Sequence, residues 1–83
     1  MPREDYADYG ADPEALFLDP DTYDDAIVGV CYDGRIVYDI NRIIAILMTR
    51  DGMTEEDAMD YFAFNIGGAY VGDMTPVYVT VVP

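Results

Sequence analysis

The stretch AIVGVCYDGRIVYDINRIIAILMTRDG, residues 26–52, contains two kinds of hydrophobic pattern in succession. Short apolar, β-branched runs at residues 26–32 and 35–38 flank the dipeptide Asp33-Gly34. Such runs around Asp-Gly predict an antiparallel hairpin with a type I′ turn, in which both central residues have positive φ. Because the first run is apolar on both faces, we expect it to form the central strand of a sheet.

The pattern then changes to the period of a helix. Apolar residues recur at Ile40, Ile43, Ile44 and Leu47, which is the spacing of one broad helical face. Asp39 can cap the start of this helix, and Gly52 can end it in the left-handed conformation. The sequence therefore predicts a helix between these two residues.

A second helix is predicted within TEEDAMDYFAFNIGG, residues 54–68. Thr54 is a suitable N-cap, and the paired glycines are suitable as the end. The expected core stripe consists of Ala58, Met59, Phe62 and Ile66. A final strand is expected at 77–82. The predicted fold is α+β, with a small antiparallel sheet packed on a helical hairpin in the order β-β-α-α-β.

The first 25 residues differ from the rest of the chain in their high content of acids and prolines. Residues 1–25 hold nine of the 17 acids, together with three prolines. This segment could be a mobile tail. Alternatively, residues 13–18 could form a helical turn that Asp12 caps and that docks Leu16 and Phe17 on the core. We expect a partly ordered N-terminal extension at 1–23 and a single α+β domain at 24–83.

The charge balance restricts the partners. Seventeen acids face four arginines, the net charge is −13, and there is no lysine. Such a field repels nucleic acid and anionic lipid, whose phosphates require basic side chains, and it attracts cationic surfaces. Adaptation to high salt, or plain solubility, is the alternative explanation for the same composition. No apolar run is long enough to span a membrane, and the acidic N-terminus does not resemble a signal peptide, so we expect a cytoplasmic protein.

The sequence lacks the residues that several kinds of catalytic and metal site require. Without His or Ser there is no Ser-His-Asp, Cys-His or zinc–histidine site, and without Lys there is no Schiff base. The acidic run at 19–25 lacks the spacing of an EF-hand. The single cysteine, Cys31, cannot form an internal disulfide and is expected to be a small buried residue. We therefore expect no metal, no cofactor and no enzymatic activity.

The outward face of the second helix is the candidate binding surface. Glu56, Asp57 and Asp60 fall opposite the core stripe, with Phe64 one turn after Asp60 and Tyr61 on the flank. Glu55 to Asp60 carries four carboxylates along roughly 7.5 Å, about the charge density of duplex DNA. Phe64 is either covered by the N-terminal segment or another surface, or exposed as an interface anchor. The full set of partner-binding candidates is Asp24, Asp25, Glu56, Asp57, Asp60, Tyr61, Phe64 and Tyr70.

Two stretches resemble a known group. RDGMTEEDAMDYFAFNIGGAYVGDMTP, residues 50–76, and DAIVGVCYDGRIVYD, residues 25–39, are similar to small acidic proteins of phages, prophages and bacteria whose activities are uncharacterised. The shared features are Phe64-Asn65 and the turn at 68–72. The resemblance assigns no catalytic residue. It implies a phage-borne accessory protein, a class that includes anti-CRISPR inhibitors that occupy DNA-binding surfaces.

Two functions follow as hypotheses. The first is a non-enzymatic inhibitor that uses its carboxylates and aromatic anchors to occupy a basic, nucleic-acid-binding surface of a host protein or ribonucleoprotein complex. The alternative is a small self-associating module, a homodimer formed through the sheet edge or Phe64.

Overall fold

The runs around Asp33-Gly34 form the predicted hairpin. The computed structural model describes residues 1–83, and strands β1 (Ile27–Val30) and β2 (Ile36–Asp39) pair antiparallel. The predicted type I′ turn is wrong, because no residue other than glycine has positive φ. The Gly34 N–H donates to the Cys31 carbonyl (2.8 Å), and Gly34 has φ +93°. This is a turn followed by a left-handed glycine, a geometry that leaves Asp33 free to accept hydrogen bonds from Arg35.

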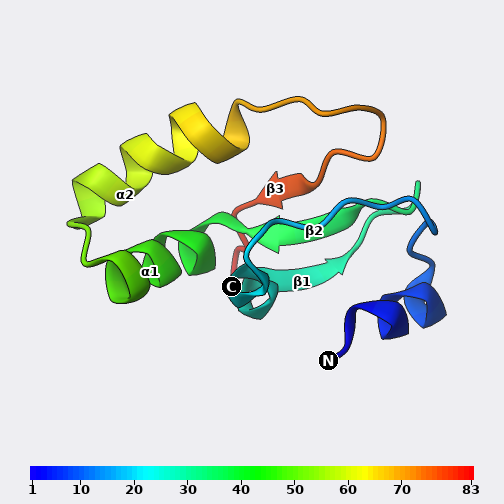
Figure 1. Cartoon of the computed structure of the whole chain (residues 1–83). Helices are drawn as coiled ribbons and strands as arrows, with labels where there is room; N and C mark the ends of the chain where they lie inside the picture. The colour runs from blue at the N-terminus through cyan, green and yellow to red at the C-terminus, as the bar shows by residue number, and fades with distance from the viewer.

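The third strand corrects the predicted sheet. β3 (Val77–Val79) is shorter than expected and pairs parallel with β2, in the strand order β1-β2-β3. The sheet is therefore mixed rather than antiparallel, β2 is central, and β1 is an edge strand. The physical reason is the connection: two antiparallel helices follow β2 and bring the chain back to enter β3 in the same direction as β2 (Figure 1).

The first helix is the predicted one. α1 (Ile40–Asp51) begins after Asp39, whose carboxylate accepts a hydrogen bond from the Asn41 N–H at 3.3 Å. It ends at Gly52, which has φ +68°. Ile43, Ile44 and Leu47 are buried, so the expected apolar stripe faces the core.

The second helix begins as predicted and then widens. α2 (Glu55–Tyr61) is capped by the Thr54 hydroxyl, which accepts from the Asp57 N–H at 3.2 Å, and it continues as a π-helical segment, η3 (Phe62–Gly67). Ala58 and Ile66 are buried and Phe62 packs on the core, but Met59 is 55% exposed, so its predicted place in the core is wrong. Ala58, Phe62 and Ile66, spaced by four, face the core, and the contact of Ala58 with Ile44 of α1 leaves Met59 on the outward side.

The N-terminal residues make specific contacts with the sheet. Two 3-10 helices form, η1 (Arg3–Tyr9) and η2 (Asp21–Ala26), and η2 spans the boundary expected between residues 23 and 24. Asp12 caps only a single turn, in which its carboxylate accepts from the Glu14 N–H (2.8 Å), and the alternative helix at 13–18 does not form, because the Leu16 N–H donates to the Met74 carbonyl instead (3.3 Å). The Leu18 N–H donates to the Tyr38 hydroxyl at 2.8 Å, which ties this segment to β2.

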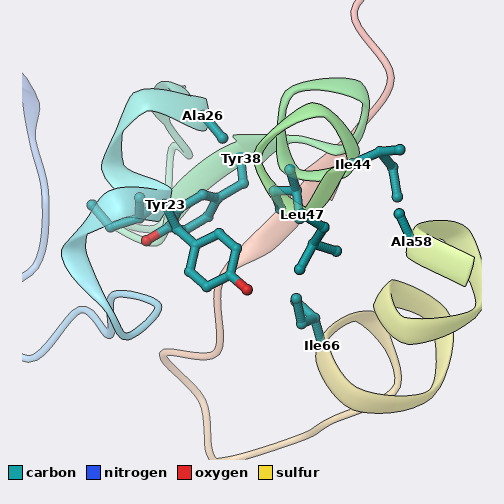
Figure 2. Close-up of a cluster of buried hydrophobic side chains, with 9 residues drawn as sticks. Tyr23, Ala26, Tyr38, Ile44, Leu47, Ala58 and Ile66 are labelled. Atoms are coloured by element: carbon teal, nitrogen blue, oxygen red, sulfur yellow. The ribbon is translucent and has the colours of Figure 1, made fainter. Parts of the chain in front are cut away.

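The core lies between the sheet, α1 and the α2–η3 helix (Figure 2). The largest fully buried side chains are Tyr38, Ile36, Ile43 and Leu47. Figure 2 shows Ala58 of α2 facing Ile44 of α1, with Tyr23 of η2 beside Tyr38. Both helices are thus fixed against the sheet, and this packing determines which side of α2 faces outward.

Candidate partner-binding surface

All four arginines form ion pairs within the fold. Arg3 pairs with Asp24 and Asp19, Arg35 with Asp33, Arg42 with Asp39, and Arg50 with Asp51, at distances between 2.8 and 3.8 Å. Of the 17 acids, five are therefore within reach of an arginine and twelve are not. The negative charge that remains is uncompensated, and its location decides where a cationic partner would be attracted.

The acids of α2 belong to this uncompensated set. Glu55, Glu56, Asp57 and Asp60 are all exposed, and none of them forms an ion pair. The first three occupy the first turn of the helix, where they complement its positive end. The packing of Ala58 against Ile44 holds their backbone in place, so the carboxylates stand on a fixed element rather than on a loop.

An exposed aromatic ring accompanies these acids. Phe64 lies on η3, one turn after Asp60, and is 82% exposed, while Tyr61 before it is also exposed. Of the alternatives for Phe64, exposure is the one found, and the N-terminal segment does not cover it: the Phe17 ring lies under the Arg3 guanidinium at 4.7 Å and beside Tyr6. The N-terminal segment packs on the core, and the ring of Phe64 stays open to a partner.

The other candidates lie apart from this face to different degrees. Tyr70 is exposed in the loop after η3, and its hydroxyl donates to Asp73 at 3.2 Å. Asp24 accepts two hydrogen bonds from Arg3 at 2.9 and 3.0 Å and is largely buried. Asp25 is exposed, but both aspartates belong to η2, which lies away from α2 in Figure 1. We call the surface made by Glu55, Glu56, Asp57, Asp60, Tyr61 and Phe64 the α2 face.

A second feature was not predicted from the sequence. An apolar hollow of about 440 Å³ lies along β1 and is bounded by η1. Its lining is Met1, Tyr6, Tyr9, Ile27, Val28, Gly29 and Val30. The apolar composition of β1 was interpreted as the sign of a central strand, and nothing in the local sequence indicates that η1 returns to flank it.

No three His, Cys, Asp or Glu side chains lie close enough together to hold a metal ion. Cys31 is half-buried beside the hairpin turn rather than in the core. No helix combines the length and apolar character that a membrane span requires.

Comparison with protein-family models, curated proteins and solved structures finds no match to the chain. No family is therefore assigned. The resemblance of residues 24–80 to small acidic phage proteins stays an expectation. The assignment of the α2 face rests on its exposure and its unpaired charge.

Proposed function

We propose that the protein is a non-enzymatic binding protein of the kind phages use against host defence. In this role the α2 face occupies a basic, nucleic-acid-binding surface of a defence ribonucleoprotein, as anti-CRISPR inhibitors do. The observation that carries the proposal is the combination on one rigid helix of four unpaired carboxylates with the 82% exposed ring of Phe64. The cytoplasm of a host cell is the corresponding compartment.

The electrostatics support this role. Four charges over about 7.5 Å of helix approach the density of duplex DNA, so a groove built for phosphates accepts them in similar positions. A net charge of −13 accelerates encounter with a basic groove and makes the rate depend on salt. Phe64 and Tyr61 add apolar contact area, which determines how long the complex lasts.

The test measures competition with DNA. The protein is applied to an immobilised CRISPR surveillance ribonucleoprotein, with and without target DNA, at rising NaCl. We expect binding that DNA displaces and that weakens at least tenfold between 50 and 200 mM salt, by analogy with phosphate contacts. Binding that is indifferent to both DNA and salt would contradict mimicry of nucleic acid.

Charge reversal locates the surface. Glu56→Lys with Asp60→Lys removes binding if the α2 face makes the contact, and Phe64→Ala increases the dissociation rate. The matched control reverses two exposed, unpaired acids elsewhere, Glu14→Lys with Asp21→Lys, which makes the same change in net charge. Equal losses in both double variants would mean that only overall charge matters. Circular dichroism checks that each variant is folded.

Self-association is the second candidate, because Phe64 and the edge strand β1 are both open. Sedimentation velocity at rising protein concentration distinguishes it from partner binding. A dimer that Phe64→Ala disrupts, together with no binding to the ribonucleoprotein, would favour this candidate.

A further inference from the structure

β1 is an edge strand that carries no charged side chain and no proline. Sheet edges carry unpaired N–H and C=O groups, and proteins usually guard them with charged side chains or proline. β1 reads Ile27-Val28-Gly29-Val30 and has neither, and Val28 is 40% exposed. β1 is only four residues long and has a bulge between Ile27 and Gly29, two features that limit edge pairing, so only a short added segment can pair with it.

The hollow of about 440 Å³ runs along this edge. All four consecutive residues of β1 line it. Gly29 has no side chain, so it lines the hollow with its backbone. The hollow therefore reaches the backbone of β1, whose outer edge pairs with no other strand, and an added strand would lie about 4.8 Å from it.

η1 forms the opposite wall and is held in position. Tyr6 and Tyr9 of η1 line the hollow. Arg3, at the start of η1, forms a two-pronged contact with Asp24 and donates to the Leu18 carbonyl at 2.8 Å. The Tyr6 ring also packs on Phe17, with ring centres 5.9 Å apart. The wall is thus preformed, which reduces the entropic cost of binding.

The charge near the hollow indicates what kind of chain can bind there. Asp5 and Asp8 of η1 are exposed, and neither pairs with an arginine. An apolar hollow in a chain of net charge −13, next to a helix with these free carboxylates, favours an extended segment that carries both apolar and basic side chains. A second copy of this protein fits less well, because each copy carries −13.

We propose that the edge of β1 and the wall of η1 bind an extended, basic peptide segment of a partner protein, which adds to the sheet as a fourth strand. Backbone hydrogen bonds supply affinity, and alternate side chains supply specificity: apolar ones lie against Tyr6 and Tyr9, and basic ones point to the opposite face of the sheet, where the negative field of the protein attracts them. Four residues of β1 span about 13 Å, enough to pair with about four residues of the peptide. This site is independent of the α2 face.

The experiment uses a fluorescein-labelled heptapeptide of alternating valine and lysine as the probe, followed by fluorescence anisotropy. One comparison peptide is N-methylated at two adjacent central residues. One N–H is then missing on each side of the peptide, so neither side can form the full set of backbone hydrogen bonds with β1. Another has glutamate in place of lysine. We expect the valine–lysine peptide to bind at least tenfold more tightly than either. Equal binding of the methylated peptide would overturn strand addition and leave only charge attraction.

Variants locate the site. Val28→Lys places a charge on the edge and is expected to weaken binding at least tenfold. Val81→Lys makes the same change at a valine that is 55% exposed, lies outside β1 and does not line the hollow, and it is expected to weaken binding less than threefold. Tyr9→Ala should weaken binding, whereas Tyr32→Ala, in the hairpin turn, should not. Equal effects within either pair would overturn the assignment to β1.

Two further measurements separate this site from the alternatives. The Glu56→Lys, Asp60→Lys variant should keep its affinity for the peptide within threefold, and a loss there would assign the peptide to the α2 face instead. Sedimentation velocity should show a monomer. A dimer that Val28→Lys dissociates would mean that β1 is an interface between copies, which would overturn the proposal.

Discussion

Single side chains connect the N-terminal segment to the core. Arg3 reaches Asp24, Leu18 and the Phe17 ring, and Arg50 donates to the Tyr23 hydroxyl at 3.0 Å while lying 4.8 Å above the same ring. From the sheet, the Tyr38 hydroxyl accepts a hydrogen bond from the Leu18 N–H. These residues join segments that are far apart in the sequence, so substitutions at them should have measurable effects on stability.

Tyr38 gives a prediction about pH. Burial raises the pKa of its hydroxyl to about 12 from the ordinary 10.0. Because the folded state has the higher pKa, the stabilisation is fully present below pH 10 and is lost as the pH rises toward 12, by roughly 2–3 kcal/mol. Tyr38→Phe leaves the Leu18 N–H unpaired and costs about 1–3 kcal/mol at pH 8.

Urea unfolding at pH 8 and pH 11.5 tests this prediction. Only the wild-type protein can ionise at position 38, so the stability gap between it and Tyr38→Phe should narrow at the higher pH. The other tyrosines, including Tyr78, whose pKa burial also raises to about 12, are common to both proteins. A gap that stays constant or widens would contradict the burial of the Tyr38 hydroxyl.

Arg3 gives a prediction about ion pairs. Its guanidinium makes two hydrogen bonds to Asp24 in a half-buried setting, whereas the Arg42–Asp39 pair is longer, at 3.6 Å, and its arginine is exposed. Arg3→Met should lower the free energy of unfolding by about 1–3 kcal/mol. Arg42→Met should lower it by about 0.5 kcal/mol or less. Chemical denaturation measures both, and equal effects would rule out a special role for Arg3.

At the scale of elements, close approach matters as much as the capping signals. The hairpin turn meets the N-terminal segment at Gly34, whose carbonyl accepts from the Asp12 N–H at 2.9 Å. A Cβ on Gly34 would lie 2.8 Å from the Asp12 Cβ. The glycine that the sequence offered as a turn residue is thus also required for packing between two elements.

Gly10 and Gly34 form a matched pair for testing this point. Both have strongly positive φ, +96° and +93°, but a Cβ on Gly10 would meet nothing within 4 Å. Gly10→Ala should therefore cost about 1 kcal/mol, from backbone strain alone. Gly34→Ala should cost roughly 1–3 kcal/mol more, because it also displaces Asp12. Thermal unfolding compares the two, and equal losses would mean that the contact with Asp12 is easily relieved.

At the scale of the whole molecule, the dominant feature is charge. Twelve acids lie beyond the reach of an arginine, so their like charges repel one another in the folded protein and lower its stability. At 1 M NaCl the screening length falls to about 3 Å, so the unfolding midpoint should rise with salt. NaCl is preferred to sulfate, which also strengthens hydrophobic burial.

A variant of lower charge serves as the control for this prediction. Glu56→Lys with Asp60→Lys adds two charges at each position and takes the net charge from −13 to −9. Its midpoint should rise less with NaCl than that of the wild-type protein, as followed by circular dichroism. A midpoint that falls with salt, or an equal rise in both proteins, would show that repulsion does not limit stability.

The candidate surfaces were predictable to different degrees. The outward position of the α2 acids and of Phe64 follows from the helical period, because position around a helix is set locally, but only the tertiary structure decided that no segment covers the ring of Phe64. Asp24 was predicted to bind a partner, but Arg3, 21 positions away, pairs with its carboxylate within the fold. The hollow along β1 could not be predicted, because it depends on where η1 packs.

The sequence by itself determined the α+β class, the order of strands and helices, and the capped boundaries at Asp39, Gly52 and Thr54. These features depend on periodicity and on hydrogen bonds within a few residues. Only the tertiary structure decided that β3 runs parallel to β2, that β1 is an edge, and that Met59 faces outward. Those outcomes depend on contacts between segments distant in the chain, and no local pattern encodes such contacts.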